Sequence, residues 1–133
     1  IIIDYKTGKE LLDPETLDFL FNRDLWKDKK FKGVMQTLIY SWVFEHAFQP
    51  EQDIIPGIYV LPEIKNENFD PGVAFKKRTI DSFQNISKEF EKHFMEILEE
   101  IFDPKVPFAQ TKEEKRCNYC PYADICHREQ VEY

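Results

Sequence analysis

The chain begins with an aliphatic run that ends in two opposite charges, and this run constrains the fold more than any other feature. Residues 1–6 read Ile-Ile-Ile-Asp-Tyr-Lys, and Thr-Gly follows directly. β-Branched residues favour strands, and a glycine commonly bounds one. Because side chains alternate along a strand, Asp4 and Lys6 share one face while Tyr5 lies on the other. The sequence therefore predicts a buried strand over residues 1–6 whose end presents a carboxylate beside an ammonium group.

Helical and strand patterns follow along the chain. They predict a helix beginning at Asp13-Pro14, a largely apolar helix over 34–48 that is packed on both sides, strands over 57–64 and 72–77, and an amphipathic helix over 79–102. An irregular connection that contains proline comes next, and the cysteines lie near the end. This order indicates an α/β fold with a central sheet flanked by helices.

Composition limits the class of protein. The 133 residues are 42% hydrophobic and 15% aromatic, which is enough for one domain with a core. The formal net charge of -7 argues mildly against a bare nucleic-acid-binding module, although a site that handles phosphate through metal ions needs carboxylates. The sequence contains no apolar run of membrane-spanning length and no signal-peptide pattern, so we expect a cytoplasmic protein with no membrane partner.

The Asp4 and Lys6 pair suits phosphodiester hydrolysis. A carboxylate can hold a hard cation such as Mg²⁺ or Mn²⁺, and a bound metal lowers the pKa of its water. A neighbouring ammonium group can orient that water or stabilise the transition state. An acid and a lysine two residues apart are common, however, and a surface ion pair at a strand end explains them equally well.

Gln36 and Tyr40 lie four residues apart, and hence on one face of the helix predicted over 34–48. Both side chains donate and accept hydrogen bonds, so they need partners on a largely apolar helix. A hydrogen-bonded pair in the core is the simpler explanation. His46 and His93 also fall on predicted helices, but we find no second metal-type ligand at suitable spacing and assign them no function.

Cys117, Cys120 and Cys126 are clustered near the end of the chain. A C-x-x-C pair can direct two thiolates at one metal, and three thiolates call for a fourth ligand. His127 could complete a zinc site, although its place directly beside Cys126 makes this strained. Three reduced free thiols are the alternative.

These motifs resemble those of a known family. The sequence DYKTG after an aliphatic run resembles the third motif of the PD-(D/E)XK nuclease superfamily, in its RecB/AddB branch. The resemblance implies a restriction-endonuclease-like core, with Asp4 as a metal ligand and Lys6 as the catalytic lysine. The family also carries a Gln-x-x-x-Tyr motif on the following helix, which implies that Gln36 and Tyr40 orient the lysine or contact DNA.

The same resemblance implies that part of the domain lies upstream. The family's earlier motifs are absent, so we expect a C-terminal portion of one nuclease domain whose N-terminal part is missing. Residues 1–102 would form its α/β core portion, and residues 103–133 a cysteine-containing staple. The cysteine spacing resembles that of AddB-type and CRISPR-adaptation nucleases, where three such cysteines and one far upstream hold a 4Fe–4S cluster. Because four thiolates are usually required, the isolated chain should hold no stable cluster.

We therefore predict the C-terminal part of a RecB/AddB-like DNA exonuclease, which hydrolyses phosphodiesters with magnesium in double-strand break repair and recombination. The family implies DNA as substrate and a helicase subunit, or a helicase domain in the same polypeptide. The isolated chain should be inactive. A non-catalytic nucleic-acid-binding module stapled by zinc or an iron–sulfur cluster, and a CRISPR-adaptation-type nuclease, remain alternatives. Two basic clusters fit a solvated surface better than a DNA-binding one: Lys27, Lys29, Lys30 and Lys32, and Lys76, Lys77 and Arg78.

Overall fold

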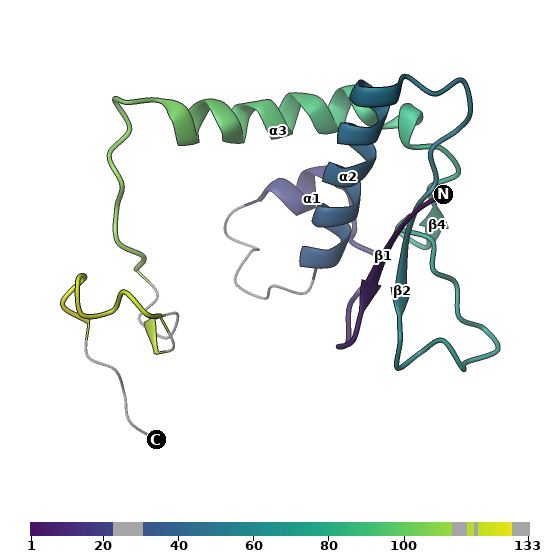
Figure 1. Ribbon diagram of the computed structural model, residues 1–133, viewed down its shortest axis with the longest axis horizontal. Helices are drawn as coiled ribbons and strands as arrows, with labels where there is room; N and C mark the ends of the chain where they lie inside the picture. The colour runs from purple at the N-terminus through teal and green to yellow at the C-terminus, as the bar shows by residue number, and fades with distance from the viewer. Residues whose placement is uncertain (23–30, 113–116, 119, 129–133) are drawn as a thin grey trace. The chain divides into compact units, whose positions relative to one another are not determined.

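The computed structural model describes residues 1–22, 31–112, 117–118 and 120–128 (Figure 1). The elements in chain order are β1 (Ile2–Lys6), α1 (Leu17–Phe21), α2 (Lys32–Phe48), β2 (Pro56–Val60), β3 (Ala74–Phe75), β4 (Arg78–Thr79), the 3₁₀ turn η2 (Phe83–Asn85) and α3 (Ser87–Phe102). The chain divides into two compact units, Ile1–Glu99 and Glu100–Tyr133, which are described separately. Among the described helices, none combines the length and apolar character that a membrane span requires.

A parallel pair of strands forms the centre of the first unit. β1 and β2 run side by side, with Asp4 opposite Ile58 and Lys6 opposite Val60 (Figure 1). Parallel neighbours need a crossover connection, and α1 and α2 supply it here. The predicted strand at the start of the chain is present. β2 ends earlier than predicted, at Val60, because residues after it form turns.

Helix α2 packs one face against this sheet. Val34, Leu38 and Ser41 are buried at helical spacing, as is Thr37. The two hydroxyl groups bond to carbonyl oxygens one turn back in the helix, at 2.9 Å each, so their burial leaves both satisfied. The core that these residues share with the strands and α3 also includes Ile58, Val60, Val73, Phe83 and Phe90.

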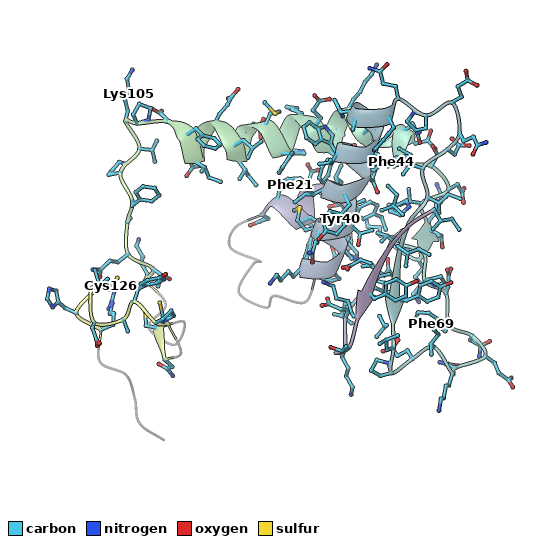
Figure 2. All side chains as sticks on the ribbon, in the orientation of Figure 1. Phe21, Tyr40, Phe44, Phe69, Lys105 and Cys126 are labelled. Carbon is cyan, nitrogen blue, oxygen red and sulfur yellow. The ribbon has the colours of Figure 1, made fainter. Side chains whose placement is uncertain are left out.

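The opposite face of α2 differs from the prediction. The sequence predicts a helix packed on both sides, but the exposed residues in the described part of the chain include Tyr40, Val43, Phe44 and Phe48. Figure 2 shows Tyr40 and Phe44 on this helix. The composition of α2 indicates burial, but only one of its faces meets the sheet.

The first helix begins later than its sequence predicts. Thr16 caps α1 by accepting a hydrogen bond from the backbone of Phe19 at 3.2 Å. Asp13, the predicted cap, instead accepts a hydrogen bond of 2.8 Å from the backbone of Lys77. The carboxylate is therefore used in a contact between distant loops, which no local pattern could reveal.

The segment predicted as one strand over 72–77 is a short hairpin. β3 and β4 pair antiparallel around Lys76 and Lys77, whose φ angles are 49° and 63°. Two residues with positive φ match the twist of a tight hairpin. Because residues 78–79 pair in this hairpin and residues 83–85 form η2, the helix predicted over 79–102 begins only at Ser87.

Candidate active site

Asp4 and Lys6 project from the end of β1 on the same face, as the alternation of the strand predicts. Lys6 Nζ lies 2.9 Å from Asp4 Oδ2, and the two side chains are 20% and 16% exposed. Tyr5 points to the other face, where its ring stacks on that of Tyr59 with centroids 5.6 Å apart. The carboxylate and the ammonium group thus form a partly buried pair that solvent can still reach.

Gln36 joins this pair from helix α2. Lys6 Nζ donates a hydrogen bond of 2.7 Å to Gln36 Oε1, and Gln36 Nε2 donates one of 2.5 Å to the hydroxyl of Tyr40. Tyr40 is 43% exposed, so the far end of the series reaches the surface. The structure brings all four predicted site residues of the core into one series of contacts, although their catalytic roles stay predictions.

The Asp4 carboxylate is in contact with the ammonium group of Lys6. Within the described residues, its Oδ2 atom is buried and has no hydrogen-bond partner, although the ammonium group lies close enough for an ion pair. A carboxylate oxygen only accepts, and the ammonium group is the contact that this oxygen makes among the described residues. A hard cation could take the place of the ammonium group at this oxygen, and Mg²⁺ commonly takes only one or two protein carboxylates and keeps several waters. The residues present therefore fit a divalent cation at Asp4.

Two further residues belong to this site, and the sequence did not reveal them. Gly33 is buried in the first turn of α2. A Cβ atom at Gly33 would lie 3.2 Å from Glu10 Oε2 and 3.2 Å from Lys6 Cε. Glu10 follows β1 in a polar connection that gives no sign of this contact, and the glycine gives none either.

A second group of possible ligands lies between α1 and α3. The ligand atoms of Asp18, Glu89 and His93 all lie within 4.8 Å of one another. His93 Nε2 is 2.8 Å from Asp18 Oδ1, and its ring stacks on Phe21. Glu89 precedes His93 by one turn of helix, a spacing that could have indicated the group from the sequence. The Asp18 side chain is 71% exposed and already pairs with the imidazole, so the contacts account for the cluster without an ion.

The cysteines occupy the second unit. Cys117 is buried and Cys120 and Cys126 are partly exposed, all as free thiols. Backbone hydrogen bonds fold the segment into tight turns, including Cys120 N to Cys117 O at 3.0 Å. The ligand atoms around His93 lie within 4.8 Å of one another. Among the described residues, the three cysteine sulfur atoms do not form a group as compact as that one.

The basic clusters are only partly visible. Lys27, Lys29 and Lys30 lie outside the described residues, whereas Lys32 is exposed at the start of α2. Lys76, Lys77 and Arg78 are exposed around the β3–β4 turn.

Comparison with known proteins identifies the family of this chain. A family model described as the PD-(D/E)XK nuclease superfamily matches residues 1–127. The chain belongs to the PD-(D/E)XK nuclease superfamily. The predicted family is thereby confirmed, and the parallel β1–β2 pair with its helices is consistent with a partial PD-(D/E)XK fold, as the predicted α/β class requires.

A curated relative is similar over much of the chain. It is a subunit of the ATP-dependent helicase/deoxyribonuclease of Caldanaerobacter subterraneus subsp. tengcongensis, and it is 26% identical over 111 residues. The match covers 79% of the present chain and 10% of the relative, so the chain spans about a tenth of that protein's length. No solved structure matches the chain.

Proposed function

We propose that the chain is the C-terminal part of a RecB/AddB-like DNA exonuclease, which hydrolyses phosphodiester bonds with Mg²⁺ or Mn²⁺ in double-strand break repair. The observation that carries the proposal is the unbroken series of contacts from Asp4 through Lys6 and Gln36 to Tyr40. Superfamily membership supports hydrolysis of nucleic acid as the reaction class. The resemblance to the RecB/AddB branch supports DNA as the substrate.

Asp4 and Lys6 have complementary roles in this proposal. Asp4 Oδ2, which lacks a hydrogen bond among the described residues, would hold the divalent cation. The cation would supply an activated water and offset the charge that builds on the phosphate. Lys6 would place its ammonium group beside the attacked phosphate, where a fixed positive charge stabilises the transition state more than the ground state.

Gln36 resolves a conflict between these two roles. The ammonium group lies 2.9 Å from the same carboxylate oxygen that a cation would need, so the two positive charges compete for Asp4. Gln36 Oε1 offers the ammonium group a second acceptor at 2.7 Å. Tyr40 in turn holds the amide of Gln36, which fixes the direction of its oxygen. The helix would thus keep the lysine in place when the carboxylate binds a cation.

The test is cleavage of DNA by the full-length protein that carries this chain. A linear duplex and a covalently closed circle of the same sequence are incubated with Mg²⁺, with Mn²⁺ and with a chelator. The proposal expects degradation of the linear DNA with either cation, none with the chelator, and a circle that survives because it has no ends. Cleavage that persists in the chelator contradicts the metal-dependent mechanism, and complete absence of cleavage favours a non-catalytic binding module.

We also propose that the intact protein works with a helicase. The curated relative's name pairs a helicase with a deoxyribonuclease, and the chain matches a tenth of that protein. A nuclease that degrades duplex DNA from its ends benefits from a motor that separates the strands. Co-purification of the full-length protein with ATP-dependent unwinding activity would support this partner, and unwinding-independent degradation would argue against it.

Cys117, Cys120 and Cys126 are proposed to hold a 4Fe–4S cluster in the intact protein, with a fourth thiolate from elsewhere. All three are free and lie within one short segment of turns, although their sulfur atoms do not form a compact ligand group among the described residues. Such a cluster would contribute its binding free energy to folding rather than to hydrolysis.

A further inference from the structure

We propose that Gly33 is a positioning residue for Lys6, because a residue without a side chain lets Glu10 and Lys6 rest together on the first turn of α2 without either giving way. This inference rests on the proposed function, since it concerns the placement of the lysine in that site. It assigns a role to two residues, Glu10 and Gly33, that no motif marks.

The lack of space for a side chain at position 33 accounts for the glycine there, whereas its backbone conformation does not. No glycine among the described residues has a positive φ, so Gly33 adopts a conformation that any residue can adopt. Glycine is unfavourable within a helix relative to alanine. The position is nevertheless buried, and a Cβ atom would lie 3.2 Å from both Glu10 Oε2 and Lys6 Cε, closer than ordinary carbon contacts. Alanine would be the better helix former here, but Glu10 and Lys6 would have to give way by a few tenths of an ångström to accept its methyl group.

The collision would be transmitted to the reacting end of the lysine. Lys6 Cε has little freedom, because the adjoining Nζ is held by Asp4 at 2.9 Å and by Gln36 at 2.7 Å. Glu10 is partly buried, and its carboxylate lies 3.2 Å from the same Cβ position. Gly33 also lies in regular helix, and its carbonyl accepts the buried hydroxyl of Thr37. An added methyl group therefore shifts Lys6 Cε or Glu10 by a few tenths of an ångström, and a shift of Lys6 strains the contacts of its ammonium group with Asp4 and Gln36.

The experiment compares Gly33→Ala with Gly8→Ala in the full-length protein. Gly8 is the matched control, because a Cβ there would meet nothing within 4 Å and its φ is not positive. Cleavage of linear DNA gives kcat and KM, and thermal unfolding gives Tm. We expect Gly33→Ala to lower kcat, by less than the roughly hundredfold that a misplacement of about 1 Å costs, with KM and Tm unchanged. Gly8→Ala should have the kcat, KM and Tm of the parent protein.

A second comparison tests whether the effect of Gly33→Ala depends on Glu10. The effect of Gly33→Ala on kcat is measured again in a Glu10→Ala background, where the helix can shift into the vacated space. We expect the loss to shrink there. The inference is overturned if Gly33→Ala leaves kcat unchanged, if kcat and Tm fall together, or if the loss is the same in both backgrounds.

Failure of this inference can be told apart from failure of the proposed function. If Lys6→Ala abolishes cleavage while Gly33→Ala does not change it, only the role of Gly33 is rejected. If Lys6→Ala cleaves like the parent, the assigned site is rejected, and the role of Gly33 is rejected with it.

Discussion

Lys6 and Gln36 lie 30 positions apart in the sequence and are joined by a hydrogen bond of 2.7 Å. The bond connects the end of β1 to the second turn of α2, and its acceptor is the side-chain amide oxygen of Gln36. Two motifs that are separate in the sequence are therefore one structural unit. The consequences of this bond can be measured independently of the family to which the chain belongs.

Removing the acceptor should weaken catalysis without breaking the ion pair. Gln36→Leu leaves Lys6 with Asp4 as its partner, so the ammonium group remains on the oxygen that a cation needs. A hydrogen bond to a charged group contributes about 1.5–3 kcal/mol, which corresponds to a loss of about tenfold to a hundredfold in kcat. Steady-state cleavage of DNA by the full-length protein measures this loss in kcat. Tyr40→Phe keeps the Lys6 bond and should lose less; an equal or larger loss would contradict this order.

Asp4 should control the response to magnesium. A ligand that binds only the folded state raises its stability, so Mg²⁺ should raise the Tm of the full-length protein. In Asp4→Asn the buried acceptor becomes neutral, and this rise should disappear. Asp53→Asn makes the same chemical change at an exposed position and should keep the rise. An undiminished magnesium effect in Asp4→Asn would place the cation elsewhere, and the exposed group around His93 would be the next to test.

The core of the first unit should depend on Phe90. Its ring is fully buried and packs on the rings of Phe21, Phe83 and Phe94. Truncation of a buried phenylalanine costs about 3–5 kcal/mol of unfolding free energy, so Phe90→Ala should sharply lower the urea midpoint of the chain. Phe108→Ala removes a fully exposed ring and should leave the midpoint unchanged. Equal effects of the two variants would show that the described packing is wrong.

The cysteines should determine the metal content of the full-length protein. If they hold an iron–sulfur cluster, the purified protein is brown and contains iron and acid-labile sulfide. Cys117→Ser should remove both, because it removes one of the thiolates proposed to hold the cluster. Zinc in place of iron and sulfide would contradict the cluster and support the zinc-stapled alternative.

The sequence predicted the parts of the site that depend on local geometry. The alternation of a strand places Asp4 and Lys6 on one face, and the helical repeat places Gln36 and Tyr40 on another, so both pairs could be found from spacing alone. The approach of the two pairs came from the family resemblance, since no local pattern joins residues 30 positions apart.

The remaining features could not be predicted because tertiary contacts decide them. Asp13 has the composition of a helix cap but binds the backbone of Lys77, which moves the helix start to Thr16. Gly33 is placed in a helix where propensity disfavours it, and its reason lies in Glu10 and Lys6 rather than in its neighbours along the chain. In each case a residue serves a distant partner at the expense of its local preference.

Cleavage of linear DNA by Lys6→Ala, in the full-length protein with Mg²⁺, tests the central claim most directly. Lys9→Ala is the control, because it removes the same charge from an exposed position three residues away. With the Tm of both variants unchanged, the account predicts a loss of about a hundredfold or more for Lys6→Ala and none for Lys9→Ala. Cleavage by Lys6→Ala at the rate of the parent protein would contradict it.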